Sequence, residues 1–178
     1  AKVPIAFFGM PWCNPIFEVN SQLKRRVRKS NFKIENFSLE TFAEFQMFLE
    51  VIQDELPIEF DGSLWNDLEL AFKLFAASSG NLSDLMEGII MPAAIEAVKD
   101  DAELLTIDYL ADAAEDNLGI LEELNPFNME LRKIEARQQY TESYWNAEAP
   151  KNSLRVEDVT YAKVKFADLE LKMALKKR

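Results

Sequence analysis

Histidine is absent from this chain of 178 residues, and cysteine occurs once, as Cys13. A Cys/His zinc site needs several such ligands and a Ser-His-Asp triad needs an imidazole, so both classes of site are excluded. A single cysteine also cannot form an internal disulfide. Catalysis by this chain would therefore depend on carboxylates, lysines, arginines or a bound cofactor.

Glycine is scarce as well: there are five, and none stands in a GxxxxGK[ST] or GxGxxG pattern. The chain encodes no phosphate-binding loop, and we expect no nucleotide hydrolysis by it alone. The first residues given do not form the long apolar stretch of a signal peptide, and no apolar run approaches the roughly 20 residues of a membrane-spanning helix. Because 48% of its residues are hydrophobic, it can still bury a core. We expect a soluble cytoplasmic protein.

The net charge of −11 conceals three blocks of different sign. Residues 1–33, called the basic block below, hold seven Lys and Arg against one acid, residues 34–123 hold two against 22, and residues 124–178 hold 11 against eight. Such blocks favour contact between the acidic middle of one copy and a basic end of an identical neighbour, and they leave the ends free for an anionic partner. Ordinary solvated faces are the alternative interpretation.

The first 37 residues have an alternating β and α pattern. Val3–Phe8 is an uncharged apolar run before Gly9-Met10-Pro11, which is typical of a strand buried on both faces in a parallel sheet. Asn14-Pro15 then predicts a helix start, and a second short strand is indicated by Phe32, Ile34 and Phe37. A unit of this kind is stable only within a larger sheet, so we predict that the chain is part of a longer protein.

Residues 38–116 have helical spacing and predict a bundle of about four helices. Gly80 should end the second helix, Asn81 or Ser83 should cap the third, and Pro92 should kink or split it. The four apolar stripes are Phe42, Phe45, Phe48, Leu49 and Ile52; Leu64, Trp65, Leu68, Phe72 and Phe75; Leu85, Met86, Ile89, Ile90 and Ala94; and Ile107, Leu110, Ala111 and Ala114. Phenylalanines at this spacing indicate a core.

Residues 118–178 are predicted to form a helical, partner-binding extension with a linker near residues 146–153. A polar segment before the linker contains Tyr140, Tyr144 and Trp145. Beyond the linker, an amphipathic helix is indicated by Val159, Ala162, Phe166, Leu169 and Met173. That helix needs a surface for its stripe, either on its own bundle or on another protein.

Three stretches carry a resemblance to a known family: Phe8-Gly9-Met10-Pro11, Asn20-Ser21-Gln22-Leu23-Lys24-Arg25-Arg26 and Phe75–Leu82. With the order of strand, turn, helix, strand and helical bundle, they resemble the C-terminal half of TnsC/TniB-like AAA+ ATPases, regulators of DNA transposition. The resemblance covers about residues 3–116. It implies an α/β then all-α fold: the end of a parallel α/β core over 1–37, a helical lid over 38–117 and the helical extension over 118–178.

The resemblance also implies arginine fingers that act in trans on the nucleotide of a neighbouring subunit. The matching positions are Arg25, Arg26 and Arg28. Arg26 is the first choice because a helix places it near Leu23 and Val27 on the packed face. The alternative is that these arginines cap the helix and stay solvated.

Met10 and Asn81 are the positions that the resemblance places beside the nucleotide. Ser83 and Asp84 stand where many relatives have a second sensor arginine, and an acid there would repel a phosphate. The family further implies ATP and Mg²⁺ in the intact protein, identical subunits in a ring or filament, duplex DNA, a transposase and a target-selecting protein. Two alternatives remain: another AAA+ ATPase of the replication-initiator, clamp-loader or signalling type, or a non-enzymatic helical interaction module.

Overall fold

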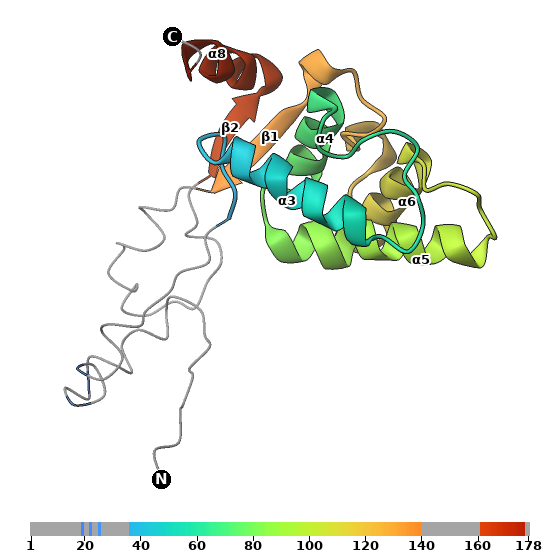
Figure 1. Ribbon diagram of the computed structural model, residues 1–178. Helices are drawn as coiled ribbons and strands as arrows, with labels where there is room; N and C mark the ends of the chain where they lie inside the picture. The colour runs from blue at the N-terminus through green and yellow to red at the C-terminus, as the bar shows by residue number, and fades with distance from the viewer. Residues whose placement is uncertain (1–18, 20–21, 23–24, 26–35, 140–160, 177–178) are drawn as a thin grey trace. The chain divides into compact units, whose positions relative to one another are not determined.

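The computed structural model describes Val19, Gln22, Arg25, residues 36–139 and residues 161–176 (Figure 1). The chain divides into two compact units, one of residues 1–35 with 140–160 and one of residues 36–139 with 161–178. Most of the first unit lies outside the described residues, and with it the predicted strand at Val3–Phe8, the aromatic segment and the linker. The account below concerns the second unit.

Helix α3, Phe42–Glu55, buries one stripe in which residues recur three and four apart: Phe42, Phe45, Leu49 and Ile52. Leu56 adopts an extended backbone after the helix, as the residue before a proline usually does. Phe37 was expected to end a strand, but it lies in irregular chain, where its N–H donates to the Gly80 carbonyl at 2.8 Å. Its ring packs edge-on against Phe45 with centroids 5.2 Å apart.

Helix α4, Leu68–Ser78, begins at Asp67, whose Oδ1 accepts the N–H groups of Glu69 and Leu70. It ends where Ser79 and Gly80 take left-handed conformations, with φ of 53° and 71°. The predicted stop at Gly80 is therefore confirmed. Of the predicted stripe, Phe72 and Phe75 are buried on the helix, whereas Leu64 is buried from the preceding turn.

The third helix changes type along its length: a π-helical stretch, η2, spans Asp84–Ile90 and α5 spans Met91–Lys99. The Met91 N–H bonds to the carbonyl of Met86, five residues back, immediately before Pro92. A proline has no N–H for an α-helical bond, so the wide turn falls where that bond would be lost. The sequence predicted a kink or a split; the structure has a change of helix type and no break in the helix.

Helix α6, Ile107–Leu118, completes the predicted four-helix bundle and ends at Gly119 with a left-handed φ of 65°. It packs against η2 and α5. A Cβ on Gly88 of η2 would collide with the side chain of Leu118, so this glycine permits the close approach of the two helices.

The C-terminal part contains two short 3₁₀ turns, η3 at Glu122–Leu124 and η4 at Leu131–Lys133, followed by a two-stranded antiparallel sheet. Strand β1, Glu135–Gln139, pairs with β2, Tyr161–Lys165, in a register that places Ala136 opposite Val164. Helix α8, Phe166–Lys176, follows directly (Figure 1). The expectation of an all-helical extension is wrong at this point, because the stripe through Ala162 belongs to a strand that pairs with distant residues.

This C-terminal part shares one core with the bundle. Leu169 of α8 is 1% exposed, Ala136 is fully buried, and the Phe166 ring packs edge-on against Phe72 of α4 at 5.4 Å. The amphipathic helix thus finds its surface on the chain's own bundle. The described unit is mostly helical with a small antiparallel sheet. This confirms the helical part of the predicted fold class. The AAA+ lid fold that the resemblance implied stays a prediction.

Candidate functional site

Of the predicted finger residues, the structure describes only Arg25, which has a helical backbone and is exposed. Val19 and Gln22, six and three residues earlier, are also helical and exposed. Arg26, Arg28 and Met10 lie outside the described residues. Arg25 and Asn81 belong to different compact units.

Asn81 is the cap of the third helix. Its Oδ1 accepts the N–H groups of Ser83 at 2.8 Å and Asp84 at 3.3 Å, and its carbonyl accepts that of Leu85 at 3.0 Å. Asn81, rather than Ser83, is therefore the capping residue, and its side-chain oxygen is already engaged. Burial raises the pKa of the half-buried Asp84 carboxyl in the same turn. The start of this helix therefore has an acidic side chain, and two of its backbone N–H groups are already bonded to Asn81.

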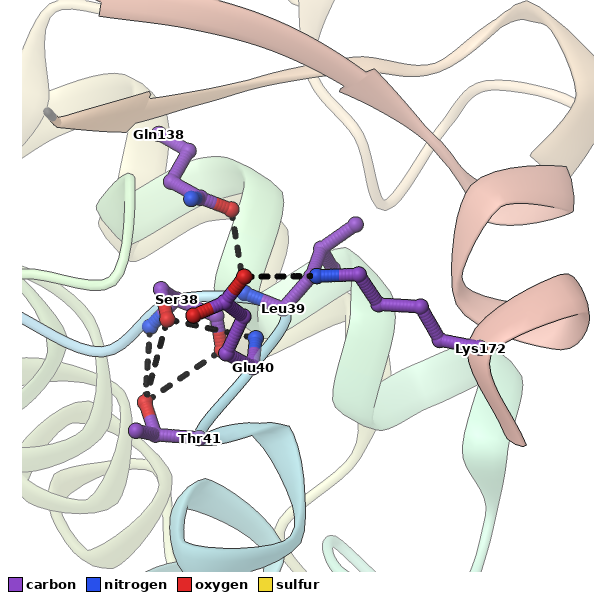
Figure 2. A network of polar contacts seen from close by, with 6 residues as sticks. All are labelled: Ser38, Leu39, Glu40, Thr41, Gln138 and Lys172. Carbon is purple, nitrogen blue, oxygen red and sulfur yellow. Dashed lines mark hydrogen bonds and ion pairs between the residues drawn. The ribbon is translucent and has the colours of Figure 1, made fainter. Parts of the chain in front are cut away.

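A second group of polar residues holds the point where the chain enters and leaves the described unit (Figure 2). The Leu39 N–H donates to Gln138 Oε1 at 3.0 Å, and Lys172 Nζ of α8 lies 3.4 Å from Glu40 Oε1. Ser38 and Thr41 form a local turn beneath them, with the Ser38 N–H donating to Thr41 Oγ1 at 2.9 Å. Residues about 100 and 130 positions apart are joined here, so this junction fastens α8 and β1 to the start of the bundle.

The α5–α6 surface is the feature that sequence reasoning missed. The Tyr109 hydroxyl of α6 donates to Asp100 Oδ2 at 3.2 Å, just after α5. Partial burial, that hydrogen bond, and the charges of Asp100, Glu96 and Asp112 all raise the pKa of Tyr109. The helical spacing of acids in this stretch was a signal that could have located the surface.

Helix α5 also carries an exposed apolar stripe, on another side of the helix from Glu96 and Asp100. Met91, Ile95 and Val98 are 50%, 52% and 51% exposed, whereas the alanines of the opposite face are buried. We call these three residues the α5 face.

Two other kinds of site find little support in the described part of the chain. No three His, Cys, Asp or Glu residues gather there as metal ligands would. A shallow hollow of about 530 Å³ is lined by Leu121, Glu122, Glu123 and Asn128, a set with two carboxylates that suits no anionic ligand. None of the helices described combines the length and apolar character that crossing a bilayer requires.

Comparison with known proteins finds no matching family, no matching curated protein and no matching solved structure.

Proposed function

We propose that this chain is the arginine-finger and lid portion of an AAA+ ATPase that assembles on DNA and regulates transposition by linking a target selector to a transposase. The observation that carries the proposal is an exposed, helical Arg25 in a basic block, followed by a bundle whose third helix opens at Gly80-Asn81. The resemblance of these same stretches to the TnsC/TniB family adds to it.

In this proposal Arg25, Arg26 and Arg28 stabilise charge on the nucleotide of a neighbouring subunit, since a guanidinium is a fixed, permanently charged group. The bundle α3–α6 is the lid over adenine and ribose. The described residues fit the phosphates of ATP poorly, because Asp84 stands at the helix start where a cation would be needed. The proposal therefore assigns phosphate and Mg²⁺ binding to other parts of the intact protein.

The test is ATP hydrolysis and nucleotide-dependent assembly on duplex DNA by the intact protein. We expect Arg26→Ala to lower hydrolysis on the order of a thousandfold while leaving nucleotide binding mostly intact. Arg25→Ala and Arg28→Ala identify the finger if Arg26 is not it, and Lys29→Ala is the matched control. Losses of only two- to threefold for all three arginines would exclude the finger role.

The partner-binding role is proposed for the C-terminal part, where Leu171 and Leu175 of α8 are 61% and 62% exposed one turn apart. A pull-down with the transposase tests it, using Leu171→Gln with Leu175→Gln. Undiminished capture of the transposase by this double variant would contradict the assignment. Because the two side chains are exposed, the fold should tolerate the change.

A non-enzymatic helical interaction module is the second candidate, ahead of the other AAA+ types, because one observation favours it. Residues 36–139 and 161–176 share a hydrophobic core of their own. Circular dichroism and light scattering on the chain alone separate the candidates: cooperative melting of a monomer favours the module, and aggregation favours a part of a larger domain.

A further inference from the structure

The outer side of helix α3 carries an apolar pair that the described unit leaves uncovered. Met47 and Val51 are 64% and 61% exposed. They lie one turn apart, on the side of the helix opposite its buried stripe, and the exposed Ala43 extends the pair by one more turn. Adjacent exposed apolar side chains of this kind indicate a contact surface.

Acidic side chains flank this pair on the same side of the helix. Four carboxylates are neighbours of Met47 or Val51, because each lies three or four residues from one of them: Glu44, Glu50, Asp54 and Glu55. Helix α3 contains no lysine or arginine, and within the described part of the chain no cation forms an ion pair with any of the four. We call the apolar pair with these four carboxylates the α3 face.

The charge of the α3 face selects among the surfaces that could cover the apolar pair. Nucleic acid and anionic lipid carry the same sign as the carboxylates and are repelled. Two copies of this chain meeting through the α3 face would bring acid against acid, which is also repulsive. The lysines whose side chains the structure describes are already engaged in ion pairs or hydrogen bonds: Lys73, Lys99, Lys133, Lys163, Lys165 and Lys172.

We propose that the α3 face binds a basic amphipathic helix of a partner protein. On such a helix, apolar side chains one turn apart pack on Met47 and Val51, and lysines or arginines on either side of them reach the carboxylates. The 14 residues of α3 give it a length of about 21 Å, so several turns of the partner can lie along it. The inference goes beyond the proposed function, since it requires neither nucleotide nor DNA nor the arginine fingers.

Fluorescence anisotropy of a labelled model helix tests the apolar half of the contact. The probe is a peptide of leucine and lysine with its leucines three and four residues apart along one side, titrated with the whole chain. Met47→Gln with Val51→Gln should raise the dissociation constant about tenfold, because two apolar contacts are lost. No binding by the unaltered chain would overturn the proposal.

The matched control is Ile95→Gln with Val98→Gln on the α5 face. These two side chains are similarly exposed, at 52% and 51%, but the residue one turn after Ile95 is Lys99 rather than an acid. This control should change the dissociation constant by less than about twofold, as exposed positions outside a contact do. Equal losses for the two double variants would overturn the assignment to α3.

Removal of two charges tests the ionic half. Glu44→Gln with Glu50→Gln should raise the dissociation constant about fivefold at low salt, and the difference should shrink as salt is added. Glu122→Gln with Glu123→Gln, at exposed positions of η3, changes the net charge by the same amount and should have little effect. Equal effects would mean attraction to the overall negative charge, which overturns the proposal.

Two further measurements separate the proposed partner from other occupants. A peptide of the same composition with its leucines spread around the helix should bind at least about tenfold more weakly, because it has no apolar side. Equal binding of the two peptides overturns the proposal. A dimer of the chain alone in sedimentation velocity that Met47→Gln with Val51→Gln converts to a monomer would assign the face to a second copy, and that result also overturns it.

Discussion

The bundle α3–α6 and the β1–β2–α8 segment contribute to one core through contacts of different range. In the bundle, neighbouring helices pack on one another. Each helix buries apolar side chains that recur three and four residues apart against its neighbours. In the C-terminal segment, β1 pairs with β2 across residues 140–160, and Lys172 reaches Glu40. The β1–β2–α8 segment therefore stabilises the bundle, and we expect the bundle to be less stable without it.

Removing β2 and α8 should have the largest effect on stability. A chain ending at residue 160 loses β2 and α8, which exposes the buried Ala136 and leaves Phe72 without Phe166. We expect the described unit to lose cooperative thermal unfolding, as followed by circular dichroism. A chain ending at Lys176 is the control and should melt like the whole protein. Unchanged melting of the shorter chain would show that the bundle stands alone.

Within α8, one buried leucine should account for much of that effect. Leu169→Ala is expected to lower the free energy of unfolding by about 2–5 kcal/mol, because it leaves a cavity against the core. Leu171→Ala, at a side chain that is 61% exposed, should change it by less than about 0.5 kcal/mol. Urea denaturation measures both. Similar values for the two leucines would mean that α8 does not pack as described.

Two glycines with left-handed backbone conformations test how closely the bundle is packed. Gly80→Ala should cost about 2–4 kcal/mol, since the added Cβ is strained at a φ of 71° and also collides with the Phe37 carbonyl. Gly119→Ala meets only the conformational cost, about 1–2 kcal/mol, because no atom lies within 4 Å of its added Cβ. Equal losses in urea denaturation would contradict the close packing at Gly80.

The smallest effect is the pH dependence, which has opposite signs in the two regions. Hydrogen bonds from Lys163 and Lys165 lower the pKa of Glu135 in the sheet. The stability that this carboxylate contributes is present above its ordinary pKa and is lost as pH falls through the lowered value. Lys163→Met with Lys165→Met should raise the pKa of Glu135, as measured by NMR titration of its carboxyl carbon.

Asp84 behaves in the other direction, because burial raises its pKa. Its contribution is present below the ordinary carboxyl pKa and is lost as pH rises through the raised value. Asp84→Asn should therefore flatten the fall in stability over the acidic range. A melting temperature that depends on pH in the same way before and after the change would contradict this sign.

The bundle was predictable because its signals are local. The spacing of Phe45 and Leu49 alone predicts which face of their helix is buried. Gly80 and Asn81 predict the end of one helix and the start of the next, and the structure confirms both. Strand β1, Glu135–Gln139, carries no such pattern, since only Ala136 is apolar. Its structure depends on a partner beyond residue 160, and the short-range periodicity of that partner wrongly assigned Ala162 to a helix.

The candidate surface was less predictable than the fold. The sequence located the acidic middle of the chain but not which helix face stays uncovered, because alanines rather than large residues form the buried side of α5. Met91, Ile95 and Val98 have the spacing of a core stripe, and only the packed structure places them outside. The finger positions Arg25, Arg26 and Arg28 stay predictions.

The wide turn of η2 gives chain length a role that composition does not show. A π-helical turn closes its hydrogen bond one residue further along the chain than an α-helical turn, so deleting one residue between Asp84 and Ile90 would restore an ordinary turn and leave α5 facing the same way. A deletion within α5 has no such extra residue to remove, and it would rotate the residues on one side of it by about 100° relative to the core. A single lost codon should therefore be tolerated in η2 far better than a few positions later in the same helix.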